Sequence, residues 1–137
     1  MNDLAARTPT TPADADAGTM FSLIAAAHTV EARLEEALAE VGLSMAKHGV
    51  LRILVEAGEP MPLGELAKLQ SCVRSNMTQL VDRLEADGLV RRVADPEDRR
   101  MVRAALTAAG EAREAEGAER IARVRDDFAA SLPEADR

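Results

Sequence analysis

The sequence predicts a mainly α fold in which a closely spaced pair of helices is followed by a β hairpin. Apolar residues make up 47% of the 137 residues, but only two are phenylalanine. Leucine, valine, isoleucine, methionine and alanine must therefore build the core, which favours packed helices. Apolar positions recur at three- and four-residue steps along most of the chain, and two short valine-bearing runs flank a proline-containing turn.

The first half of the chain predicts an arm and two helices. Residues 1–18 are rich in Thr, Pro, Ala and Asp, which is typical of a disordered arm. A long helix is expected over about residues 19–41, and Gly42 is a suitable C-terminal stop. Ser44 is a good N-cap for a second helix, which closes at Gly58. The following "EPMP" is expected to be a short extended link.

Two further helices, a hairpin and a last helix follow. "LGELAKLQ" is barely two turns long, and "RSNMTQLVDRLEADG" is a longer helix. The runs "LVRRVAD" and "MVRAAL" predict an antiparallel, two-stranded hairpin. Thr107 can cap a last helix over about residues 108–132, before a tail at 133–137. The apolar positions of the longer helix of the pair have helical spacing: Met77, Leu80, Val81 and Leu84.

This order of elements is that of a winged helix-turn-helix. If the apolar stripe of the longer helix is buried, short or amide-bearing side chains remain outside. Asn and Gln can pair bidentately with adenine, and Arg can do so with guanine, in the major groove of DNA. An ordinary solvated helix face usually carries more Glu and Lys, so the pattern favours DNA reading. The outward residues are Ser75, Asn76, Thr78, Gln79, Asp82 and Arg83.

The hairpin tip "DPEDRR" carries two adjacent arginines. A hairpin beside a major-groove helix can reach the neighbouring minor groove, whose negative potential attracts arginine where A·T-rich DNA narrows it. In this interpretation Asp98 orients the neighbouring guanidinium groups. A solubilising turn would explain Asp95, Pro96 and Glu97 well, and would explain the arginine pair poorly.

The net charge of −7 argues against nucleic acid only when it is averaged over the whole chain. Between Ser71 and Leu106, seven arginines and six acids give +1, while ten basic and eighteen acidic residues elsewhere give −8. The local field at a groove matters more than the total charge.

The strings "LGELA", "RSNMTQLVDRLEADGLVRR", "DPEDRR" and "LTAAG", in this order and spacing, resemble the MarR family of bacterial transcription regulators. The resemblance covers about residues 19–132. It implies a homodimer built from the helices at about 19–41 and 108–132, with a DNA-binding lobe at about 60–107 in each subunit. By the same resemblance, we expect a repressor that reads a pseudo-palindromic operator in double-stranded DNA.

The family pattern implies roles for particular residues. Arg100 matches the arginine that enters the minor groove, Asp98 matches the acid that braces it, and Arg99 is expected at the DNA backbone. The positions that match the recognition helix are Arg74, Ser75, Asn76, Thr78, Gln79 and Arg83.

The chain departs from the family pattern at the start of the recognition helix and just before it. Val73 stands where members usually have a small N-cap, so capping is expected from Ser71 or Ser75. Gln70 stands where members often have Leu, and Leu69 is expected to compensate.

Single residues of the chain raise three possibilities: a reactive thiol, a metal site and an effector pocket. Cys72 lies near a helix start, where a thiol can be reactive, but we favour a packing role in the turn. Two histidines and one cysteine fall short of a zinc site, so neither a metal nor another cofactor is expected. The family resemblance implies a small aromatic or phenolic effector, for which His28, His48 and Arg52 are candidate lining residues.

Enzymatic function is not expected, because the sequence holds no Gly-rich phosphate loop, no H-E-x-x-H motif and no nucleophile elbow. No apolar run is long enough to span a membrane, and a single cysteine fits a reducing compartment, so we expect a soluble, cytoplasmic protein. The competing hypothesis is a winged-helix module for protein interaction or dimerisation, without specific DNA binding.

Overall fold

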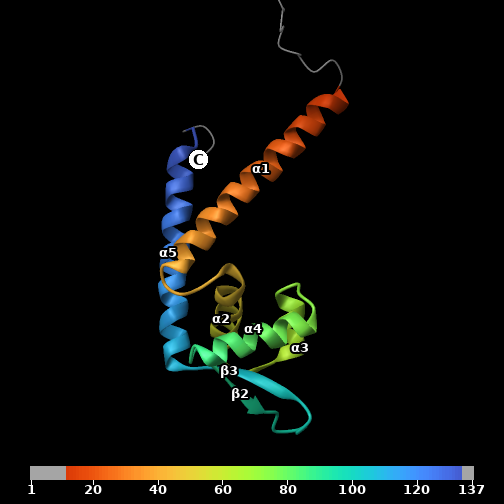
Figure 1. Ribbon diagram of the computed structural model, residues 1–137, viewed down its shortest axis with the longest axis vertical. Coiled ribbons are helices and arrows are strands. Elements are labelled where there is room, and N and C mark those ends of the chain that lie inside the picture. The colour runs from red at the N-terminus through yellow and green to blue at the C-terminus, as the bar shows by residue number, and fades with distance from the viewer. Residues whose placement is uncertain (1–11, 134–137) are drawn as a thin grey trace, which may run out of the picture. The chain divides into compact units, whose positions relative to one another are not determined.

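The computed structural model describes residues 12–133, with side chains from residue 16 onward. The chain up to Arg33 forms one unit, and the chain from Leu34 onward forms a second. The elements are α1 (Pro12–Ala39), α2 (Met45–Ala57), β1 (Met61–Pro62), α3 (Leu63–Leu69), α4 (Arg74–Ala86), β2 (Val90–Ala94), β3 (Val102–Leu106) and α5 (Ala108–Ser131), as labelled in Figure 1.

The first helix starts earlier than its apolar pattern predicts. We expected a disordered arm through residue 18 and a helix from Thr19, but α1 begins at Pro12. Proline suits the first position of a helix, alanine has the highest helix propensity, and acids near the start complement the helix dipole. These local preferences extend the helix through "PADADAG", where no apolar stripe is present. The remainder of the predicted arm, residues 1–11, lies outside the described residues.

Helix boundaries in the second unit agree with the expected caps. Gly42 has φ 71°, and the amide of Leu43 donates to the carbonyl of Leu38 over 2.9 Å, so a left-handed residue ends α1. The Ser44 hydroxyl accepts from the amide of Lys47 over 3.1 Å and caps α2. Gly58, with φ 68°, closes that helix as predicted.

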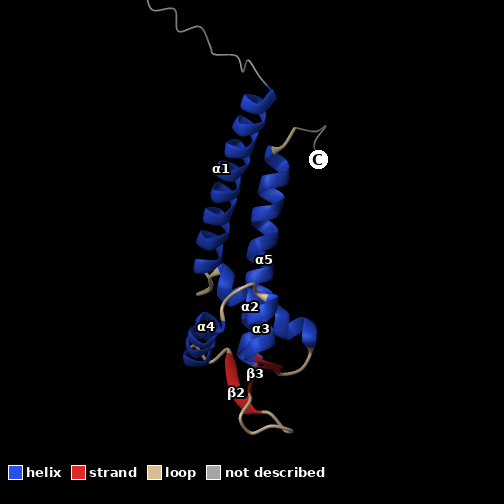
Figure 2. Cartoon of the chain, turned by 90° about the vertical axis from the view of Figure 1, so that its right-hand side faces the viewer, coloured by secondary structure: helices blue, strands red, loops and turns tan. Residues whose placement is uncertain are grey.

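The sheet has three strands in the order β1-β3-β2, one more than the two-stranded hairpin that the sequence predicts. Strands β2 and β3 pair antiparallel, with Val90 opposite Leu106 and Ala94 opposite Val102. The "EPMP" link is extended as expected, but Met61 also pairs with Ala104. In Figure 2 the red strands β2 and β3 and their loop lie at the opposite end of this unit from the C-terminal end of α5.

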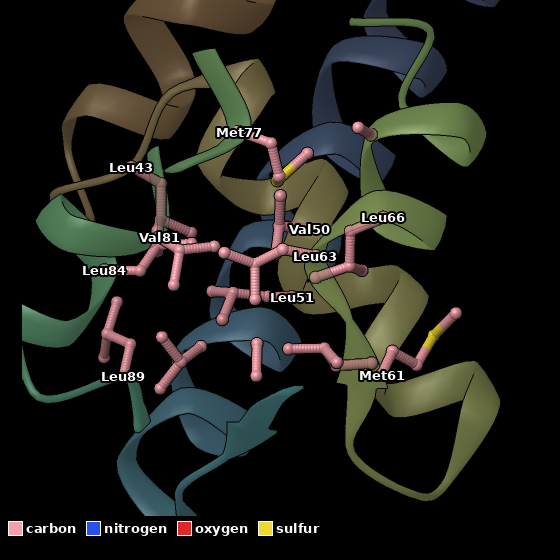
Figure 3. Close-up of a cluster of buried hydrophobic side chains, with 14 of the residues drawn as sticks. Leu43, Val50, Leu51, Met61, Leu63, Leu66, Met77, Val81, Leu84 and Leu89 are labelled. Atoms are coloured by element: carbon pink, nitrogen blue, oxygen red, sulfur yellow. The ribbon is translucent and has the colours of Figure 1, made fainter. Parts of the chain in front are cut away.

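One hydrophobic core fixes the helix pair to the sheet (Figure 3). Helices α2, α3 and α4 and the start of β2 each contribute fully or nearly fully buried aliphatic side chains. This packing determines which face of α4 remains available to solvent. The labelled members of the cluster are Leu43, Val50, Leu51, Met61, Leu63, Leu66, Met77, Val81, Leu84 and Leu89.

The last helix is anchored where it leaves the sheet. The Thr107 hydroxyl accepts from the amide of Gly110 over 3.0 Å and donates to the carbonyl of Gly88 over 2.7 Å, so the predicted cap is confirmed. A Cβ at Gly110 would overlap the backbone carbonyl of Leu89, which explains the glycine in "LTAAG". Further along α5, a Cβ at Gly117 would lie 2.5 Å from Cδ2 of His48. Two glycines thus permit α5 to approach Leu89, just before β2, and His48 of α2 closely.

Candidate nucleic-acid interface

Helix α4 buries one face and exposes another. Met77, Val81 and Leu84 are fully buried, and Leu80 packs partly against the core, so the predicted apolar stripe is confirmed. The hydrophobic contacts of this stripe hold the helix against α3 and the sheet, and its remaining side chains face solvent. The exposed residues are Arg74, Ser75, Asn76, Thr78, Gln79, Asp82, Arg83, Glu85 and Ala86.

The start of α4 differs from the expected capping. Val73 occupies the N-cap position, and no side chain caps the helix there, so the prediction of a cap from Ser71 or Ser75 was wrong. Ser71 instead adopts φ 54° in the turn between the helices. The end of α3 explains this conformation. The Ser71 amide donates to the Lys68 carbonyl, and the Cys72 amide donates to the Ala67 carbonyl. These bonds terminate α3, and Ser71 is the left-handed residue that such a helix end requires.

Gln70 stabilises the turn by a route that the sequence did not indicate. Its Nε2 donates to the carbonyl of Ala46 over 2.9 Å, and its side chain lies against Gly49 of α2. Leu69 is 62% exposed, so the expectation that it compensates for the missing apolar residue was wrong. An amide that bonds to the first turn of α2 replaces the apolar contact instead.

Cys72 lies in the same turn and packs partly against the hydrophobic core. Its half-buried position agrees with the packing role that we favoured over a reactive thiol. It also lines, with Asn76, Gln79 and Arg83, an open hollow of about 380 Å³ beside α4.

Arg92 of β2 contacts the exposed side of α4, and this contact was missed from the sequence. Its guanidinium lies 2.5 Å from Asp82 and 3.1 Å from Glu85, and it donates to the Thr78 carbonyl over 3.3 Å. Its backbone amide also donates to Glu85 over 2.8 Å. The Arg92 side chain therefore fixes α4 to the hairpin and neutralises Asp82, an acid on the face that we expect to approach DNA. No local pattern signals a partner on another element.

The turn between β2 and β3 is organised around Asp95, which is 7% exposed. Its Oδ1 accepts from the amides of Glu97 over 2.8 Å and Asp98 over 3.2 Å, and its Oδ2 accepts from Nε of Arg103 over 2.7 Å. The amide of Glu97 and the Arg103 guanidinium lower the pKa of Asp95, and the Asp95 carboxylate raises the pKa of Arg103. A buried, hydrogen-bonded Asp95 is therefore not accounted for by the alternative of a solubilising turn.

The two adjacent arginines lie at the tip of this turn. The Arg100 side chain is 94% exposed, and its Nε lies 3.5 Å from Oδ1 of Asp98. The same Asp98 oxygen accepts from the Arg100 amide over 3.0 Å. Asp98 thus contacts both the backbone and the side chain of Arg100, and its role in orienting Arg100 toward DNA stays a prediction. Arg99 is exposed beside it.

The charges on this surface are only partly neutralised. Ion pairs occupy Arg92 and Arg103, whereas within residues 12–133 no acid pairs with Arg74, Arg83 or Arg99. These unpaired arginines come from both ends of α4 and from the tip of the turn. Uncompensated positive charge is therefore present on both the helix and the hairpin, although the chain as a whole is acidic.

The candidate effector residues fall in different surroundings. His48 and Arg52 line a hollow of about 370 Å³ between α2 and α5, with Glu114, Ile121 and Arg125 among the other lining residues. The His48 ring is buried, and its Nε2 lies 3.3 Å from the carbonyl oxygen of Glu114. Arg52 pairs with Glu56 over 3.0 Å. His28 is exposed on α1, in the other unit of the chain.

The described part of the chain offers neither a metal-ligand cluster nor a membrane-spanning helix. No group of three or more His, Cys, Asp or Glu side chains there is arranged to hold a metal ion. None of the helices over residues 12–133 is long and apolar enough to cross a membrane.

Comparison with known sequences supports the family resemblance. Residues 43–102 match the sequence model of the MarR family. The HTH-type transcriptional repressor YetL of Bacillus subtilis is 34% identical over 107 residues, which cover 75% of this chain and 64% of YetL. The chain spans between 32% and 64% of the lengths of the curated relatives that it matches.

Solved structures of similar fold include two regulators. AbsC, a MarR family transcriptional regulator from Streptomyces coelicolor, has a TM-score of 0.80 and 27% identity, over 90% of this chain and 84% of AbsC. The transcriptional repressor CouR bound to a 23-mer DNA duplex has a TM-score of 0.75 and 29% identity, over 85% of this chain and 81% of that chain. CouR from Rhodococcus jostii RHA1 bound to p-coumaroyl-CoA has a TM-score of 0.73 and 27% identity, over 85% and 82%.

Proposed function

We propose that this chain is a member of the MarR family, that it is a sequence-specific DNA-binding transcription regulator, and that it acts as a dimeric repressor. The observation that carries the proposal is the exposed polar face of α4 beside an exposed arginine tip. The apolar stripe of α4 is fully used in the core, so its Asn, Gln, Thr and Arg side chains are left to meet a ligand. Such side chains suit base edges in a major groove.

In the proposed complex, α4 reads the major groove and the turn between β2 and β3 enters the adjacent minor groove. Asn76 and Gln79 are suited to adenine, and Arg83 is suited to guanine or phosphate. Arg100, braced by Asp98, is the minor-groove residue, and Arg99 contacts the DNA backbone. Arg74, Ser75 and Thr78 complete the surface of α4.

A second copy of the chain is the proposed partner for the apolar residues that remain exposed on the outer helices. Phe128 of α5 is 41% exposed, and α1 exposes four large apolar side chains, Met20, Phe21, Leu23 and Ile24. A twofold dimer places two recognition helices on half-sites about one helical turn apart, about 34–36 Å. We expect sedimentation at micromolar concentration to give a dimer that Phe128→Ala weakens. A stable wild-type monomer that binds a palindrome tightly would refute this assembly.

The hollow between α2 and α5 is the proposed effector site. Apolar Ile121 and Ala118 suit an aromatic ring, and Arg52 would have to exchange its pair with Glu56 for the carboxylate of a small aromatic acid. Such an acid resembles the coumaroyl part of the ligand named for CouR. Titration with p-coumarate should weaken DNA binding by the wild type, and Arg52→Ala should reduce that response. If p-coumarate leaves DNA binding unchanged at millimolar concentration, this compound is not the effector and the site is left without a supported ligand.

Binding of the purified protein to DNA from the promoter of its own gene tests the regulator function. We expect a protected stretch with twofold symmetry, bound more tightly than a scrambled fragment of the same length and composition. Binding to a protein partner without any protected DNA would instead favour an interaction module.

A further inference from the structure

Asp95 is a buried acid in a turn whose other charged side chains face solvent. Only 7% of it is exposed, although it lies at the base of the exposed loop that joins β2 and β3. A carboxylate is rarely buried unless its oxygens are hydrogen-bonded or paired with a cation. Solubility alone therefore does not account for its place.

The partners of Asp95 lie on both sides of the loop. Its Oδ1 accepts from the amides of Glu97 and Asp98, over 2.8 and 3.2 Å, which sets the backbone direction after Pro96. Its Oδ2 accepts from Nε of Arg103 on β3, over 2.7 Å. One carboxylate thus ties the outgoing part of the loop to the strand that follows it.

These contacts continue to the exposed arginine. The amide of Met101 donates to the Asp98 carbonyl over 3.0 Å, and the Asp95 amide donates to the Met101 carbonyl over 3.1 Å, so the loop closes on itself. The Asp98 side chain then accepts from the Arg100 amide over 3.0 Å. A path of hydrogen bonds leads from Arg103 through Asp95 and Asp98 to Arg100.

We propose that Asp95, held by Arg103, is a positioning residue that presents Arg100 to the minor groove. The inference rests on the proposed function and assigns a role to two residues that need not touch DNA. Without the Asp95 carboxylate, the amides of Glu97 and Asp98 lose their acceptor and the loop is free to adopt other turns. Arg100 is almost fully exposed, so no packing contact of its own would keep its direction.

The test measures the dissociation constants for two operators that differ only in having A·T or G·C flanks. Four proteins are compared: the wild type, Asp95→Ala, Arg100→Ala and the double variant. We expect Asp95→Ala to reduce the preference for A·T flanks by roughly three- to tenfold. The double variant should have the same flank preference as Arg100→Ala, because Asp95 acts through Arg100. Glu97→Ala is the matched control. It removes an exposed carboxylate from the same turn but keeps the backbone amide that donates to Asp95, so its flank preference should equal that of the wild type.

If Asp95 only stabilises the fold, the results should differ. Asp95→Ala would then lower the melting temperature and weaken binding to both operators equally, or its effect would add to that of Arg100→Ala. Either result overturns the proposal. Should Asp95→Ala fail to fold, Asp95→Asn puts an NH2 donor opposite either Nε of Arg103 or the amides of Glu97 and Asp98, so one of the two sets of contacts that Asp95 makes is lost. The proposal requires both sets, so an unchanged flank preference in Asp95→Asn would overturn it. If Arg100→Ala itself alters neither operator, the proposed function of the wing fails, and this separates the two ideas.

Discussion

Replacing Arg100 by alanine should weaken DNA binding without weakening the fold. The side chain is 94% exposed and its closest acid, Asp98, lies 3.5 Å away. A solvent-exposed pair at that distance contributes only about 0–1 kcal/mol to folding. We therefore expect the melting temperature of Arg100→Ala to remain within about 3 °C of the wild type.

The binding loss should be larger than the folding loss. A well-made specific contact from arginine to DNA is worth about 1–3 kcal/mol, which is a factor of about 5 to 160 in the dissociation constant. The loss should be greater on an operator with A·T-rich flanks, where a narrow minor groove strengthens the attraction. Fluorescence anisotropy with matched A·T- and G·C-flanked duplexes at physiological salt gives the dissociation constant for each duplex, and hence both the binding loss and its dependence on the flanks.

Two controls separate this contact from a general charge effect. Arg123→Ala removes another exposed arginine, on α5, and should bind both duplexes as the wild type does. Gln79→Ala should instead relax the base preference at one position of each half-site. If Arg100→Ala binds both duplexes as tightly as the wild type, the turn is only a soluble loop and the argument is refuted.

Three further predictions concern the scaffold. Gly110→Ala should lower the stability by about 1–3 kcal/mol or more, because its Cβ would overlap the Leu89 carbonyl; an unchanged denaturation midpoint would contradict the close approach. Cys72→Val should leave DNA affinity and any peroxide response unchanged, whereas Cys72→Ser should cost about 1 kcal/mol; loss of an oxidant response in the valine variant would reveal a reactive thiol. The hydrogen bond from the Glu97 amide and the Arg103 guanidinium lower the pKa of Asp95. The ionised carboxylate therefore stabilises the fold above the unfolded-state pKa of about 3.9, and this stabilisation is lost as the pH falls through the lower folded-state pKa. The difference in melting temperature between wild type and Asp95→Asn should therefore be constant from about pH 7 to 5 and shrink below about pH 4; a difference that grows on acidification would contradict it.

Local patterns were sufficient to predict most of the helices and the surface of α4. The spacing of Met77, Val81 and Leu84 identifies the buried face, and burial of that face leaves the outward residues by elimination. Caps at Ser44 and Thr107 were likewise evident, because a capping side chain bonds to an amide three residues away.

Features that depend on distant partners were not predictable. The strand Met61–Pro62 is too short to show an alternating pattern and is defined by its pairing with β3. Arg92 and Asp95 looked like ordinary charged residues, since their partners Asp82 and Arg103 are brought near only by the hairpin. The start of α4 was misassigned for a similar reason, because the end of α3 determines the conformation of Ser71.

The most direct test of the DNA-binding function is the salt dependence of binding to the protected promoter fragment. Arg74, Arg83 and Arg99 are unpaired within residues 12–133, which gives six such cations in a two-lobed dimer. If each neutralises one phosphate, a plot of log affinity against log salt should have a slope of about −5. Triple substitution of these arginines by glutamine should make that slope much shallower, and the part that remains should come from cations such as Arg100. An affinity for the promoter fragment that is independent of salt, or equal to that for a scrambled fragment, would contradict a DNA-reading role for α4 and the wing.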